Sequence, residues 1–161
     1  MVKSITYGEI DFKQVCDKIR LYTEKDIQSD YVISVGTDSQ SVNGVTRMVS
    51  VISVIRKTKG GIFFYDITNL KKIYDLRQKL YTETQYSLDL ALKVKEFIKN
   101  NHINASFEVH IDMGTNGETN SLIKEINGWV SSLGFKCCMK PDSYASSTVA
   151  DKISKKQYKV S

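Results

Sequence analysis

The sequence predicts an α/β fold in which a five-stranded mixed sheet is flanked by helices. Three apolar runs, at 31–35, 45–55 and 62–67, follow one another with only short turns between them. Over 70–100 the period of the apolar residues then changes from two residues to 3.6 residues, and the longer period is typical of a helix. Two strand–helix–strand units follow, and such crossovers favour parallel pairing. We therefore expect an antiparallel meander of strands 1 to 3, with strands 4 and 5 parallel to strand 1.

Turn and cap residues support each of these elements. Asn43-Gly44 is typical of a tight hairpin between the first two strands, and Gly60-Gly61 separates the second strand from the third. Asp11 is placed to cap a helix over 11–28. The remaining expected elements are a strand at 107–111, a helix from Thr119 or Asn120, a strand at 135–139 and a last helix from about Tyr144.

Composition favours one ordinary domain over 1–161, with the helix at 11–28 packed on it. Hydrophobic residues make up 41% of the 161 residues and charged residues 25%. No apolar run approaches the ~18 residues of a membrane span, so we expect no membrane partner. The N-terminal segment has no apolar run typical of a signal peptide, and three cysteines form no disulfide framework, so a cytoplasmic setting is expected. The net charge of +5 is compatible with nucleic acid as partner.

Three acidic residues are placed where the predicted fold would bring them together. Asp38 is expected at the end of the first strand or one residue beyond it, and Asp112 follows the fourth strand. If these strands are parallel neighbours, the two carboxylates emerge side by side. Glu83 lies in the middle of the apolar stripe of the 70–100 helix, where an unpaired carboxylate would be costly to bury. Clustered oxygen ligands of this kind suit Mg²⁺ or Mn²⁺.

Three short motifs extend this interpretation. They are Gly36-Thr37-Asp38-Ser39-Gln40, His110-Ile111-Asp112-Met113-Gly114 and Lys140-Pro141-Asp142-Ser143-Tyr144-Ala145. Together with the element order, they resemble the YkuK family of bacterial ribonuclease H-like proteins over roughly residues 10–155. The resemblance implies a ribonuclease H-like fold, in which Asp38, Glu83 and Asp112 match the acids of the first strand, the helix and the fourth strand.

The resemblance also implies a fourth acid, and the sequence offers two. The superfamily usually takes this acid from near the start of the last helix. Asp151 fits as a carboxylate on that helix and is our first choice. Asp142 fits the Lys-Pro-Asp-Ser segment and is the alternative, although it could instead cap the helix.

Four polar residues are candidates for contacting substrate. Ser39 and Gln40 follow Asp38, and His110 shares the strand face of Asp112 two residues later. Asn116 lies in the loop that follows Asp112. Each residue also has an ordinary structural explanation, such as turn chemistry or a local hydrogen bond.

The function implied is metal-dependent hydrolysis of phosphodiester bonds in RNA or DNA, by a two-metal mechanism with Asp38, Glu83, Asp112 and Asp151 as ligands. No side-chain nucleophile is needed, because a water would attack. The alternative is a ribonuclease H-like module that binds nucleic acid or protein without catalysis, since a fold does not fix a function.

Overall fold

The computed structural model describes residues 2–4, 7–113 and 120–139. In chain order its elements are β1 (Val2–Ser4), β2 (Gly8–Ile10), α1 (Phe12–Glu24), β3 (Tyr31–Val42), β4 (Val45–Arg56), β5 (Gly60–Lys71), α2 (Leu76–Asn100), β6 (Ser106–Ile111), α3 (Asn120–Ser132) and β7 (Lys136–Met139).

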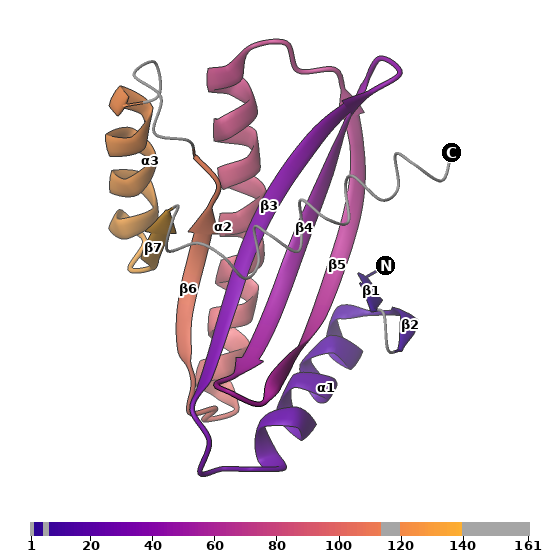
Figure 1. Ribbon diagram of the computed structural model, residues 1–161, viewed down its shortest axis with the longest axis vertical. Coiled ribbons are helices and arrows are strands. Elements are labelled where there is room, and N and C mark those ends of the chain that lie inside the picture. Colours follow the sequence, from indigo (N-terminus) through magenta and orange to yellow (C-terminus); the bar gives the residue numbers. More distant parts are fainter. Residues whose placement is uncertain (1, 5–6, 114–119, 140–161) are drawn as a thin grey trace.

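The strands form one mixed sheet in the order β2-β1-β5-β4-β3-β6-β7. β3, β4 and β5 are the predicted antiparallel meander, β6 is parallel to β3, and β7 is parallel to β6 (Figure 1). The α/β class is therefore confirmed, but the predicted number of five strands was wrong, because the described residues form a sheet of seven. The two additional strands, β1 and β2, have three residues each, too few to show an alternating pattern.

The three helices share one core with one face of the sheet. Val15 of α1, Leu88 of α2 and Ile126 of α3 belong to the same buried cluster as Ile33 and Phe64 of the sheet. α2 lies behind the long strands in the view of Figure 1, which places it across β3 and β6. A smaller cluster, formed by Val49 and Val51 with Tyr65 and Ile67, lies at the alternate strand positions and therefore on the opposite face.

The first strand is longer than its apolar run predicts. Asp38 was expected at or just beyond the strand end, but β3 continues to Val42 and Asp38 pairs with Val49 inside it. The Asn43-Gly44 turn explains this correction. Both residues have positive φ (46° and 78°), which fits the twist of a two-residue hairpin. β4 therefore pairs with β3 through the polar residues that follow Val35, up to Val42 at the turn.

The helix expected over 70–100 begins later than predicted. β5 continues to Lys71, and α2 begins at Leu76 after the N-cap Asp75, whose carboxylate accepts a hydrogen bond from the backbone N–H of Gln78. The helix predicted from 11 begins as expected, because Asp11 caps α1 in a capping box with Gln14, but it ends at Glu24 rather than at 28. The helix predicted from about Tyr144 lies outside the described residues. Within the described ranges, no helix is both long and apolar enough to span a membrane.

Candidate metal centre

Strand register brings Asp38 and Asp112 together. The parallel pairing of β3 with β6 runs from Val32 with Ser106 to Gly36 with His110. Continuing this register by two residues places Asp112 beside Asp38, on the same face of the sheet. β6 ends at Ile111, so from this point the edge of β3 is unpaired among the described strands. A side chain from the helix layer can therefore approach this edge.

Glu83 makes that approach from α2. Ser39 donates a 2.5 Å hydrogen bond to Oε1 of Glu83, and one helical turn later Ser87 donates a 2.8 Å bond to Oγ1 of Thr37. The spacing of the two contacts matches on both elements, because four residues of a helix rise about 6 Å and two residues of a strand about 6.6 Å. α2 therefore runs antiparallel to β3 and is held in a fixed register along it. This register places Glu83 beside the polar end of the strand.

The carboxylates interact electrostatically. Glu83 is 7% exposed and Asp38 9% exposed. Burial, together with the negative charges of Asp38 and Asp112, raises the pKa of Glu83 to about 7 against the lowering effect of the Ser39 hydrogen bond. Three carboxylates thus converge in a site where Glu83 does not ionise easily near neutral pH. A cation placed between them would relieve both the repulsion and the cost of burial.

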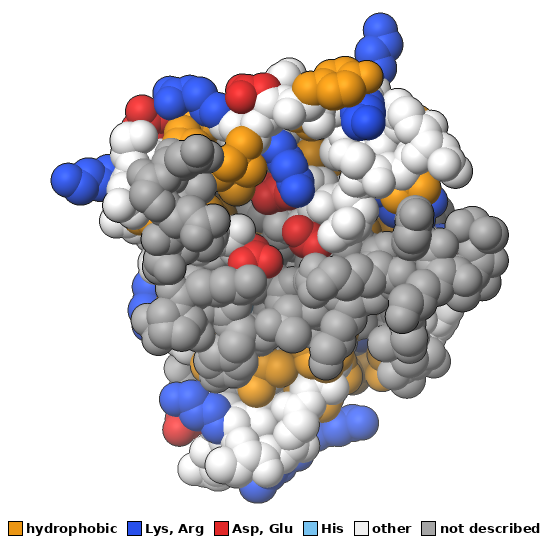
Figure 2. All heavy atoms as spheres, turned by 45° about the horizontal axis from the view of Figure 1, so that its top comes forward, with side chains coloured by type: hydrophobic (Ala, Val, Ile, Leu, Met, Phe, Trp, Pro, Cys, Tyr) orange, Lys and Arg blue, Asp and Glu red, His pale blue; other side chains and the backbone are white. Residues whose placement is uncertain are grey.

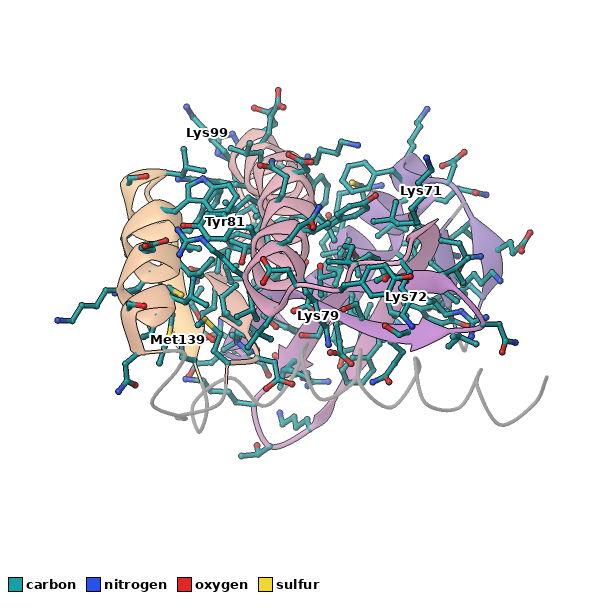
Figure 3. The ribbon with its side chains drawn as sticks, turned by 90° about the horizontal axis from the view of Figure 1, so that it is seen from above. Lys71, Lys72, Lys79, Tyr81, Lys99 and Met139 are labelled. Atoms are coloured by element: carbon teal, nitrogen blue, oxygen red, sulfur yellow. The ribbon has the colours of Figure 1, made fainter. Side chains whose placement is uncertain are left out.

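One basic residue, Lys79, acts on this cluster, because its positive charge lowers the pKa of Glu83. Lys79 precedes Glu83 by four residues and so lies on the same face of α2. In Figure 3 Lys79 points from α2 toward the strands, whereas Tyr81 points toward α3, where it stacks on Trp129. The space-filling view shows acidic side chains gathered next to a basic one near the centre of the visible face (Figure 2).

The remaining predicted site residues have different positions. Ser39 is buried and bonded to Glu83, and Gln40 is half-buried, directly across from Arg47 of β4. His110 is 2% exposed, and its Nε2 lies 2.9 Å from Oε2 of Glu108. Whether these side chains contact substrate stays a prediction. Asn116, Asp142 and Asp151, the other predicted site residues, lie outside the described residues.

Sequence reasoning missed two basic residues at this end of the sheet, Lys79 and Arg47. The four-residue spacing from Glu83 was a signal for Lys79. For Arg47 the signal was weaker, because its place opposite Gln40 follows only from the hairpin register. Nε and Nη1 of Arg47 are buried without a hydrogen-bond partner in the part of the chain that the structure describes. Arg47 as a whole is half-buried, and buried guanidinium nitrogens without partners are costly unless an anionic ligand satisfies them.

The donor set fits a hard divalent cation. Asp38, Glu83 and Asp112 offer carboxylate oxygens only, which suits Mg²⁺ or Mn²⁺ better than a thiolate-preferring metal. A bound cation would favour the ionised carboxylate of Glu83 and so offset the rise in its pKa.

Comparison with known proteins agrees with this fold. A family model described as Ribonuclease H-like matches residues 14–155. The chain is also similar to the Uncharacterized protein YkuK of Bacillus subtilis (strain 168). The two are 29% identical over 164 residues, covering 94% of this chain and 95% of that protein.

Proposed function

Because this chain belongs to the ribonuclease H-like family, we propose that it is a metal-dependent nuclease that hydrolyses phosphodiester bonds of RNA or DNA. The observation that carries the proposal is the convergence of Asp38 in β3, Glu83 in α2 and Asp112, which directly follows β6. The electrostatic effect of both aspartates on Glu83 supports their proximity. Carboxylates gathered in this way destabilise a metal-free protein, which favours a binding role over a purely structural one.

Each carboxylate has a role in this proposal. Asp38 and Asp112, side by side at the open edge of β3, would hold Mg²⁺ or Mn²⁺ between them, and Glu83 would complete the set from the helix side. Bound divalent ions supply an activated water and stabilise the leaving oxygen in phosphodiester cleavage. Ser39 acts as a positioning residue, because its hydrogen bond fixes the orientation of the Glu83 carboxylate. Asp151, with Asp142 as the alternative, stays the proposed fourth acid.

Two cations support nucleic acid as the substrate. Arg47 lies across from Gln40, and Gln40 shares a sheet face with Asp38 two residues earlier. The Arg47 guanidinium is therefore on the face of the candidate metal centre, with buried donors that a substrate phosphate would satisfy. Lys79 flanks the same centre from α2. Cations on both sides of a carboxylate cluster suit a polyanion whose backbone passes over it.

The proposal is tested by incubating the wild-type protein with end-labelled single-stranded RNA, single-stranded DNA and an RNA–DNA hybrid. We expect cleavage with Mn²⁺ or Mg²⁺ and none with excess chelator. Adding Mn²⁺ back after chelation should restore the activity. Binding of these substrates without cleavage at any metal concentration would favour the binding-module alternative and contradict a nuclease.

A further inference from the structure

A second group of potential metal ligands lies outside the candidate metal centre. Glu108 and His110 are alternate residues of β6, and Cys138 of β7 lies directly across from His110. All three therefore lie on the same sheet face, and one ligand atom from each lies within 4.8 Å of the others. Val109, between the two β6 residues, belongs to the core on the helix side.

The polar groups of this cluster are buried. His110 is 2% exposed and Cys138 8% exposed, and the Glu108 side chain is 17% exposed. Glu108 receives a hydrogen bond from Cys138, lies 2.9 Å from Nε2 of His110 and pairs with Nζ of Lys136 at 3.2 Å. Nδ1 of His110, by contrast, is buried and has no partner among the described groups. A metal shared with Glu108 would bind Nε2, because Nε2 is the ring nitrogen that faces this carboxylate.

We propose that Glu108, His110 and Cys138 form a separate site for a thiolate-binding divalent ion such as Zn²⁺, which fastens the edge strand β7 to β6. A thiolate, an imidazole and a carboxylate are the three donor types that Zn²⁺ takes in proteins, at about 2.0–2.3 Å. Tetrahedral ligands at those distances lie about 3.5 Å apart. The 2.9 Å between His110 and Glu108 would have to widen slightly, and any pair near the 4.8 Å limit would have to contract.

The donor set separates this site from the carboxylate centre. A thiolate and an imidazole select Zn²⁺ or Co²⁺ over Mg²⁺, whereas three carboxylates do the reverse. Burial, with the Glu108 charge adding to it, raises the pKa of the Cys138 thiol to about 11. Metal binding must therefore displace the thiol proton to solvent, so apparent affinity increases with pH. The neighbouring thiol of Cys137 belongs to the helix-side core and is a matched control.

The test is a titration of the metal-free protein with Co²⁺, followed by its absorption spectrum. We expect a thiolate-to-cobalt charge-transfer band that saturates at one equivalent and disappears on addition of Zn²⁺. The band should be absent in Cys138→Ser and present in Cys137→Ser, with far-ultraviolet circular dichroism verifying that both are folded. His110→Gln, which keeps the thiol, should weaken Co²⁺ binding at least about tenfold.

Asp38→Asn should keep the band, because the carboxylate centre contributes no thiolate. This variant separates failure of the present proposal from failure of the proposed nuclease function. No charge-transfer band in the wild type at saturating Co²⁺ would overturn the proposal. A band that survives Cys138→Ser would also overturn it.

Discussion

Asp38→Asn is expected to reduce metal-dependent cleavage at least about 100-fold while the protein stays folded. Residues that only orient a metal ligand typically contribute 10- to 100-fold to metal affinity or activity, so loss of a direct ligand should cost at least as much. The substitution keeps the shape of the side chain within β3, where Asp38 pairs with Val49, and removes one of the converging negative charges.

The same variant should also respond less to Mn²⁺. Binding to the folded state stabilises a protein by about 2.7 kcal/mol at a ligand concentration 100 times Kd. We therefore expect millimolar Mn²⁺ to raise the melting temperature of the wild type clearly and that of Asp38→Asn much less. Asp66→Asn is the matched control, since Asp66 is an exposed aspartate in β5. If Asp38→Asn unfolds while Asp66→Asn does not, the role of Asp38 is structural.

Glu83→Gln is expected to stabilise the metal-free protein at pH 8. Burial raises the pKa of Glu83 to about 7, against an ordinary value of 4.5. The folded state therefore binds a proton more tightly than the unfolded state does, and stability falls as pH increases from about 4.5 through 7. A shift of this size corresponds to about 3 kcal/mol at pH 8. Glutamine has nearly the same shape, carries no charge and can still accept the bond from Ser39.

Thermal unfolding at pH 5 and pH 8, without metal, measures this effect. We expect Glu83→Gln to match the wild type closely at pH 5 and to melt several degrees higher at pH 8, since each kcal/mol shifts the melting temperature by roughly 2–4 °C at this size. Glu96→Gln, an exposed change on the same helix, should follow the wild type at both pH values. Equal pH dependence of Glu83→Gln and the wild type would show that Glu83 does not titrate in the expected range.

The sequence was sufficient to predict the parts of the fold that depend on periodicity. The meander, the long helix and the parallel strands follow from patterns of two and 3.6 residues, and the parallel rule placed Asp112 near Asp38. Glu83 stood out because a carboxylate in the middle of an apolar stripe needs an explanation. The end of β3 was misplaced, because the residues after Val35 are mostly polar and show no apolar pattern, although most of them are buried and pair with β4.

Contacts that depend on strand register could not be predicted in the same way. The bond from Ser39 to Glu83 requires the relative position of α2 and β3, which no local pattern specifies. The position of Cys138 across from His110 depends on the pairing of β7, a strand of four residues after a helix. A spacing rule for metal sites would not detect this cluster, since Cys138 follows His110 by 28 residues and is adjacent to it only in the sheet.

Crystals grown with Mn²⁺ would show directly whether Asp38, Glu83 and Asp112 hold a divalent metal together, through an anomalous difference map collected near the manganese absorption edge. We expect a peak bounded by these three carboxylates. No peak there at saturating Mn²⁺, or a single peak at Glu108, His110 and Cys138, would show that the three carboxylates do not form a metal centre.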